Sequence, residues 1–314
     1  MNLDSVRAFK QEVSDAIVEA AGTDPATVSF FAASEPPMPH ALALGVAKEG
    51  DQFVVAIRTD APALAEHLKD RAGGEADVRI IKVTKRTTPA FLQGTVRPLE
   101  PGAQVGMANK NFVGTLGGLV RDAAGRLYIL SNSHVLADEG TAQPGHRIGQ
   151  PFGTTPIALL ERFIPFSTTT PNLVDCAIAR LDHTSILGEG WNGALQDRIA
   201  GVREVTPDDL GSDATKIGRT TGVRKGKVTA IEIDGLPVGY DVGVLRFNDQ
   251  VEISGGPATD FSAAGDSGSL IVSLRDRKAI GLLFAGGKDG SGEDFTYANR
   301  LTSVLGALGV ELVF

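Results

Sequence analysis

The chain is poor in cysteine and in aromatic residues. Its 314 residues include one cysteine, Cys176, which excludes an intrachain disulfide and favours a reducing, cytoplasmic location over a secreted one. Phe, Trp and Tyr make up 6% of the residues, whereas glycine is abundant, with 38 residues. Short strands joined by tight turns use residues in this way. Because 42% of the residues are hydrophobic and 22% are charged, the composition predicts a globular chain rather than a disordered one.

Long apolar runs and an excess of basic residues are also absent. No run of ~18 apolar residues occurs, so we expect no membrane-spanning helix. Residues 1–22 carry acidic residues throughout and do not resemble a signal peptide. The formal net charge of −8 argues against a nucleic-acid partner, whose phosphates require a basic surface. The five histidines form no Cys/His cluster or H-E-x-x-H motif, so we expect no metal and no cofactor.

Residues 1–92 have the pattern of a small α+β domain. Apolar residues recur at the spacing of one helical face near the N-terminus. They are Val6, Phe9, Val13 and Ile17. A second helix is expected over 61–72, and polar–apolar alternation predicts three or four strands, the last over 77–84. The role of this domain stays open between regulation through a partner, homo-oligomerisation and substrate selection.

From about residue 93 the pattern changes to short apolar runs separated by turn residues, which is typical of antiparallel barrels. A more polar segment divides these runs into two sets. The expected units are a first barrel over about 93–183, a linker over about 184–212, a second barrel over about 213–300 and a C-terminal helix. We expect that helix to pack Val304, Leu305 and Leu308 against the protein.

Three polar residues stand in settings that predict catalysis. A serine hydroxyl becomes a nucleophile when a histidine takes its proton and a carboxylate orients the histidine. Ser267 lies in the turn "GDSGSL", which taken alone is equally typical of a structural turn. His134 follows the apolar run "LYIL" in "LYILSNSHVL". Asp175 interrupts the apolar segment "NLVDCAIARL", where an acid is costly unless it is paired.

The segments "SNSHVL", "VDCAIARL" and "GDSGSL" resemble, in this order, the His, Asp and Ser segments of the trypsin-like serine proteases. The order excludes the α/β-hydrolases and the subtilisins. "GTLGGLV", "YILSNSHVLA" and "KIGRTTG" are most similar to bacterial peptidases related to the plant narrow-leaf protein. The resemblance covers about residues 93–314. It implies a mainly β fold, with two six-stranded antiparallel β-barrels of the chymotrypsin type preceded by the small α+β domain.

The same resemblance implies a role for each site residue. Ser267 would attack a peptide carbonyl, His134 would move the proton, and Asp175 would orient His134. The backbone N–H groups of Gly265 and Ser267 would form the oxyanion hole. The substrate-binding residues that it implies are Phe261, Ser262, Phe284, Ala285 and Gly286. Phe261 at the base of the specificity pocket predicts a shallow apolar pocket for small or medium uncharged side chains.

The sequence departs from that family by lacking an activation site that would release a new N-terminus. In zymogens of this fold, the acid before the serine pairs with that terminus, so Asp266 must either find another partner or face water. We therefore expect an oxyanion hole that is formed constitutively or ordered by a partner. Three functions stay open: an intracellular serine endopeptidase acting on proteins or peptides, a low-activity or inactive binding or regulatory protein with the same fold, and an esterase. The complete triad favours the first.

Overall fold

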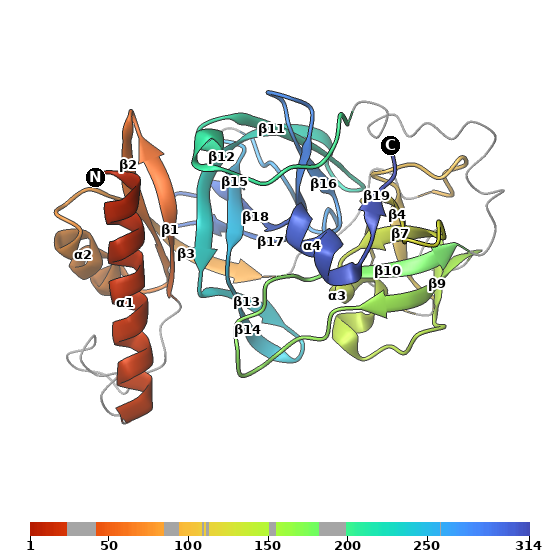
Figure 1. Cartoon of the computed structure of the whole chain (residues 1–314), viewed down its shortest axis with the longest axis horizontal. Coiled ribbons are helices and arrows are strands. Elements are labelled where there is room, and N and C mark those ends of the chain that lie inside the picture. The colour runs from red at the N-terminus through yellow and green to blue at the C-terminus, as the bar shows by residue number, and fades with distance from the viewer. Residues whose placement is uncertain are drawn as a thin grey trace.

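Two mostly antiparallel sheets contain the strands of the structure (Figure 1). The computed structural model describes residues 1–23, 42–84, 94–108, 110, 113–150, 155–181, 199–257 and 259–314, with the backbone alone for 16–23 and 82–84. Its helices are α1 (Leu3–Thr23), α2 (Pro62–Arg71), α3 (Ser133–Leu136) and α4 (Leu301–Leu308), with 3-10 turns at Asp138–Gly140 and Pro207–Asp209. Among the described residues, no helix is long and apolar enough to cross a membrane.

The eight-stranded sheet contains the strands of the region predicted as the first barrel. Its strands, in spatial order, are β19 (Glu311–Leu312), β6 (Gly118–Arg121), β7 (Leu127–Ser131), β10 (Ala177–Leu181), β9 (Thr155–Phe163), β8 (Arg147–Gln150), β4 (Gln104–Met107) and β5 (Gly114–Thr115). In the described residues the outermost strands, β19 and β5, do not pair with each other, so this sheet is a half-barrel. β19 lies near the C-terminus of the chain and forms one edge of this sheet, beside β6.

The second barrel closes as a ring of six strands. In order around the ring they are β11 (Asp213–Gly218), β16 (Leu270–Ser273), β17 (Ala279–Asp289), β18 (Asp294–Arg300), β15 (Gln250–Ser254) and β12 (Gly222–Asp234), and β12 pairs back to β11. A hairpin of β13 (Leu236–Tyr240) and β14 (Gly243–Phe247) follows β12. The mainly β fold class predicted from the sequence is confirmed, with the open first sheet as the difference.

The N-terminal strands continue the sheet of the second barrel. They are β1 (Leu42–Glu49), β2 (Gln52–Thr59) and β3 (Ala76–Thr84). β1 pairs with β12, and β3 pairs with β17, so the three strands close a second ring of seven strands with β17, β18, β15 and β12. The sequence pattern of residues 1–92 describes a separate small domain, but its strands share a sheet with the second barrel. The division into domains therefore stays a prediction. Residues 184–198 of the expected linker lie outside the described residues.

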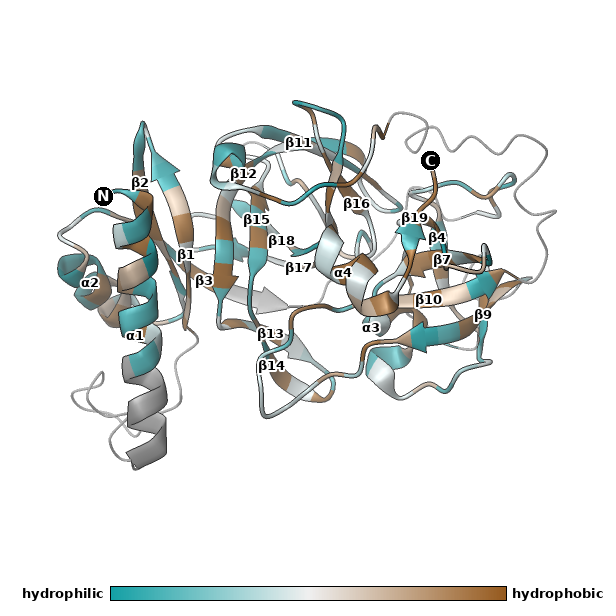
Figure 2. Cartoon of the chain, viewed as in Figure 1, coloured by the Kyte–Doolittle hydropathy of each residue, from teal (hydrophilic) through white to brown (hydrophobic). Residues whose placement is uncertain are grey.

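Apolar burial joins the same two regions. Val6, Phe9 and Val13 on α1 belong to one core cluster with Val228 and Ile253 of the second barrel. The side chain of Ile17, predicted on the same face, lies outside the described residues. At the other end, α4 buries Val304, Leu305 and Leu308, as predicted. Figure 2 shows that α1 carries both apolar and polar residues, as a helix with one covered face does.

A buried ion pair crosses between the N-terminal strands and the second barrel. Arg58 on β2 and Glu252 on β15 are both fully buried and share two hydrogen bonds, of 2.7 and 2.8 Å. Arg58 also donates to the Asp77 carboxylate at 2.6 Å, and Tyr297 donates to Glu252 at 3.0 Å. Burial alone would raise the pKa of Glu252, but attraction to Arg58 outweighs it and lowers that pKa to about 2. The pair therefore stays ionised inside the protein.

Replacing Arg58 by methionine is expected to lower the free energy of unfolding by about 3–5 kcal/mol, because buried Glu252 would keep, among the described residues, only Arg79, at 3.8 Å, as a cationic neighbour. The matched control is Arg7→Met, which breaks a partly exposed pair with Glu232 and should cost less than about 1 kcal/mol. Urea denaturation at pH 7 measures both. Because the folded pKa of Glu252 is depressed, its contribution is present above pH 4.5 and is lost as the pH falls towards 2. Equal losses of unfolding free energy in the two variants would contradict a stabilising role for the buried Arg58–Glu252 pair.

Candidate active site

Adjacent strands bring His134 and Asp175 together. β7 ends at Ser131, and His134 lies in the short helix α3 directly after it. Asp175 lies two residues before the start of β10, which pairs with β7. His134 Nδ1 lies 2.5 Å from Asp175 Oδ2, and the backbone N–H of His134 donates to Asp175 Oδ1 at 3.2 Å. Both residues are buried, so the carboxylate fixes the orientation of the imidazole ring.

Three further residues hold Asp175, and none of them was predicted from the sequence. The Tyr240 hydroxyl donates to Asp175 Oδ2 at 2.8 Å, which is the oxygen that also contacts His134. The side chain of Asn132 donates to the Asp175 carbonyl at 2.7 Å, and the Asn299 side chain accepts from its N–H at 2.9 Å. Burial raises the pKa of Tyr240 well above 10, and the charge of Asp175 adds to this. The phenol is therefore a hydrogen-bond donor throughout the physiological pH range.

Ser267 lies in a tight turn between β15 and β16, which we call the Ser267 turn (residues 263–269). Gly265 and Gly268 have φ values of 93° and 97°, a conformation that side chains other than glycine rarely adopt. The Ser267 carbonyl accepts a hydrogen bond from Thr115 of the first sheet at 2.8 Å. A Cβ on Gly114 would lie 2.8 Å from that carbonyl oxygen and 2.4 Å from Val135, the residue after His134. The turn therefore packs directly against the segment that carries His134.

The Ser267 hydroxyl and the second histidine nitrogen have no mutual hydrogen bond in this conformation. Ser267 Oγ donates instead to the Phe284 carbonyl at 3.4 Å. His134 Nε2 is buried and, within the described part of the chain, has no hydrogen-bond partner. Hydrogen bonds between catalytic groups often tighten when substrate binds. The imidazole ring is fixed through Nδ1, and its Nε2 is buried without a partner among the described residues. A neighbouring proton donor could therefore form a hydrogen bond to Nε2.

Two threonine hydroxyl groups fix the peptide planes around Gly265. Thr220 Oγ1 donates to the Ala264 carbonyl at 2.7 Å. In a trans peptide the C=O and N–H point in opposite directions, so this bond turns the Gly265 N–H away from Thr220. Thr115 Oγ1 donates to the Gly265 carbonyl at 2.8 Å. Among the hydrogen bonds of the described residues, none uses the N–H of Gly265 or of Ser267, so both groups remain available as donors.

Asp266 has an internal cationic partner. Lys216 Nζ on β11 lies 2.7 Å from Asp266 Oδ2, and both side chains are fully buried. The carboxylate also accepts from the Thr221 hydroxyl at 2.6 Å and from the Thr220 N–H at 2.9 Å. Burial alone would raise the pKa of Asp266, but attraction to Lys216 lowers it below its ordinary value. Lys216 is therefore the cation that pairs with Asp266 in this structure.

The predicted substrate-binding residues divide into two groups. Phe261 is fully buried in the core cluster of the second barrel and packs against Gly226. Ser262 is also buried, with its hydroxyl 2.7 Å from that of Thr296. Phe284 and Ala285 lie on β17, and the Phe284 carbonyl faces the Ser267 hydroxyl. The backbone of β17 thus lies beside Ser267, whereas Phe261 as the base of a specificity pocket stays a prediction.

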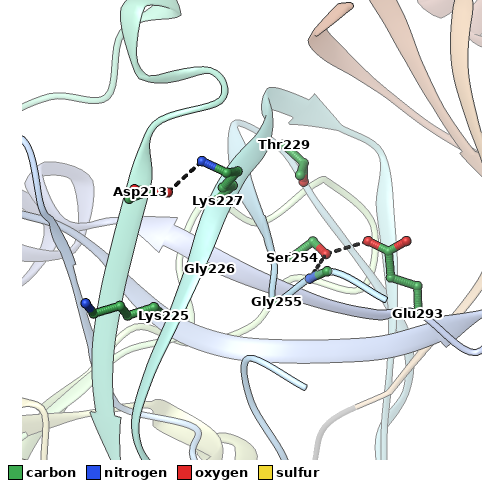
Figure 3. A pocket seen from close by; sticks show the side chains of 9 residues that line it. Asp213, Lys225, Gly226, Lys227, Thr229, Ser254, Gly255 and Glu293 are labelled. Atoms are coloured by element: carbon green, nitrogen blue, oxygen red, sulfur yellow. Dashed lines mark hydrogen bonds and ion pairs between the residues drawn. The ribbon is translucent and has the colours of Figure 1, made fainter. Parts of the chain in front are cut away.

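A separate surface hollow lies between β12 and the start of the loop after β15 (Figure 3). Lys227 pairs with Asp213 at 2.6 Å at one side of it, and Ser254 donates to Glu293 at 2.6 Å at the other. The hollow contains none of His134, Asp175 and Ser267. Cys176 lies in the core, and burial raises the pKa of its thiol. Across the described ranges, no three His, Cys, Asp or Glu side chains cluster as metal ligands would.

No protein-family model matches the chain, and no curated protein matches it. Solved structures to which the chain is similar include protease A of Thermobifida fusca, with 18% identity and a TM-score of 0.46, covering 68% of this chain and 97% of that one. The Nocardiopsis protease NAPase has 18% identity and a TM-score of 0.47, over 68% of this chain and 98% of that one. The Cellulomonas bogoriensis chymotrypsin has 19% identity and a TM-score of 0.44, over 68% and 97%.

Proposed function

We propose that the chain is a serine endopeptidase whose catalytic residues are Ser267, His134 and Asp175. One observation carries the proposal. Asp175 holds His134 through Nδ1 at 2.5 Å, and the opposite nitrogen, Nε2, is buried and has no partner among the described residues. A structural histidine would be expected to use both nitrogens when buried. A histidine with one nitrogen oriented by a carboxylate and the other open beside a serine turn is arranged as a general base.

The proposed reaction follows from these contacts. Ser267 Oγ forms a bond to the carbonyl carbon of the substrate while its proton passes to His134 Nε2. The resulting imidazolium is stabilised by Asp175, whose two oxygens already accept from His134 and Tyr240. The same proton then passes to the leaving amine as the C–N bond breaks. Water, activated by His134, hydrolyses the acyl-enzyme and returns the proton to Ser267.

The developing negative charge on the carbonyl oxygen needs donors that are already in place. The N–H groups of Gly265 and Ser267 are the proposed donors. Thr220 and Thr115 hold the two peptide planes on either side of Gly265, at 2.7 and 2.8 Å. A donor that is oriented before the reaction costs no reorganisation when charge develops. These threonines are therefore proposed as positioning residues of the oxyanion hole.

A fluorophosphonate probe tests the proposal directly, because it reacts with serine hydroxyl groups that a neighbouring base activates. We expect one covalent adduct per chain, located at Ser267 by peptide mass spectrometry and absent from Ser267→Ala. The control Ser303→Ala, on α4, should be labelled like the wild type. A folded wild-type protein that does not react would favour the alternative of a binding or regulatory protein with this fold.

Replacing Tyr240 by phenylalanine is expected to lower kcat/KM by about tenfold and to move the acidic limb of its pH profile to higher pH. A hydrogen bond to a charged group contributes about 1.5–3 kcal/mol, of which part is expressed in the transition state. Without the hydroxyl the Asp175 charge is less dispersed, so it favours the imidazolium, which cannot act as a base. Tyr128→Phe is the control, because its hydroxyl donates to Asp122 outside the site at 3.0 Å. An unshifted profile would argue against this role.

A further inference from the structure

Among the described residues, β17 has three partner strands, and these leave a gap beside Ser267. β18 pairs along the length of one edge. β16 and β3 therefore share the other edge, β16 at Ala279–Leu282 and β3 at Gly286–Asp289. Between them, Leu283 exchanges hydrogen bonds with the backbone of the Ser267 turn. In the described part of the chain, Phe284 and Ala285 are left without a strand partner on this edge.

This gap lies where a peptide substrate would have to be. The Phe284 carbonyl accepts from Ser267 Oγ at 3.4 Å, so the two unpaired residues adjoin the reacting hydroxyl. Extended peptides bind to proteins by adding a strand to a sheet edge, and their backbone hydrogen bonds supply affinity. A peptide that presents its carbonyl to Ser267 can therefore pair with Phe284 and Ala285. It cannot pair further along β17, because β3 is already there.

β3 approaches the gap in the direction that a substrate strand would take. It runs antiparallel to β17, from Ile81 opposite Asp289 to Thr84 opposite Gly286. At its end, Thr84 also pairs with Gly239 on β13, the residue before Tyr240. β3 is thus fixed on both edges immediately beside the proposed active site. Figure 1 shows β3 extending from the N-terminal helices towards β13.

We propose that β3 is a specificity-determining element that limits the pairing of a substrate with β17 to the two residues before the scissile bond. This inference rests on the proposed endopeptidase function. The N-terminal region occupies the edge on which residues further from the scissile bond would pair. The substrates favoured by this arrangement are peptides recognised over a short segment on their acyl side.

Peptide substrates of increasing length test the proposal. We expect kcat/KM of the wild type to be nearly equal for chromogenic amides with two and with four residues on the acyl side. The variant Val83→Pro/Thr84→Pro lacks two backbone N–H groups and cannot keep the β3 ladder. In it, the four-residue substrate should gain about tenfold over the two-residue one, as two new backbone hydrogen bonds allow. The control Val83→Ala/Thr84→Ala retains the N–H groups and should keep the wild-type ratio.

A binding measurement separates this inference from the proposed chemistry. In a Ser267→Ala background, fluorescence anisotropy with a four-residue acyl peptide should show about tenfold tighter binding to the proline variant than to its alanine control. Circular dichroism confirms that each variant is folded. A wild type that already gains tenfold from two to four residues overturns the inference, as does a folded proline variant with an unchanged length ratio and unchanged binding. Failure of fluorophosphonate labelling with the binding difference intact would instead contradict the proposed function.

Discussion

Replacing Ser267 by alanine is expected to lower kcat for peptide hydrolysis by about 10⁴-fold or more, because the attacking oxygen is removed. The fold should be retained, since the hydroxyl makes a single weak bond, of 3.4 Å, to Phe284. Single-turnover kinetics with a peptide amide measures the loss. The matched control is Ser269→Ala, two residues along the same turn. Its hydroxyl donates to the Asp266 carbonyl at 2.6 Å, so we expect a loss of about tenfold or less.

The triad can be tested as a unit by combining variants. If Ser267 and His134 act in one proton transfer, the double variant Ser267→Ala/His134→Ala should be no slower than the more impaired single variant. Losses that multiply would mean that the two residues act separately. Residual turnover of the Ser267→Ala protein at the wild-type level would contradict Ser267 as the nucleophile.

Replacing Lys216 by methionine is expected to lower kcat/KM by about 10²-fold or more and the free energy of unfolding by about 3–5 kcal/mol. Methionine has a similar length but no charge, so Asp266 would be buried without a cation. Asp266 lies between the two proposed oxyanion donors, and a shift of its backbone would displace both N–H groups. Because the folded pKa of Asp266 is depressed, the contribution of the pair is present near neutral pH and is lost as the pH falls through that pKa.

Lys227→Met is the matched control for this experiment. Lys227 lies on the neighbouring strand and pairs with Asp213, but both side chains are about 60% exposed. The same substitution there should cost less than about 1 kcal/mol and leave kcat/KM unchanged. Activity and thermal unfolding of the two variants would be compared, with intact mass recorded alongside. If wild-type activity arose only after cleavage to a new N-terminus, the Lys216–Asp266 pair would not be sufficient to order the Ser267 turn.

The sequence predicted the residues that have strong local signals. Asp175 stands out because an acid within an apolar segment needs a partner, and its partner proved to be His134 at 2.5 Å. The spacing of Val304, Leu305 and Leu308 likewise predicted a helix and its buried face. Such patterns depend on burial and periodicity, which are visible within a few residues of the chain. The catalytic role of the triad itself stays a prediction that the labelling and kinetic experiments address.

The supporting contacts could not be predicted, because each depends on residues distant in sequence. Tyr240 lies 65 positions from Asp175, and Lys216 lies 50 positions from Asp266. The residues next to Tyr240 and Lys216 in the sequence do not indicate that either side chain pairs with a buried carboxylate. The pairing of β3 with β17 could not be predicted either, because the two strands are also far apart in sequence. A polar–apolar alternation predicts that a strand exists but not which strand lies beside it.

The two rings of strands have a consequence for the integrity of the chain. β17, β18, β15 and β12 form a wall common to both rings, and α1 shares its apolar core with the second barrel. A protease that cut the chain between Thr84 and Gly94 would break one covalent connection but none of the strand pairings of the described residues. The N-terminal fragment should therefore remain bound as a noncovalent subunit. Fragments 1–84 and 94–314, produced separately, are candidates for reassembly into one folded particle, as a split protein.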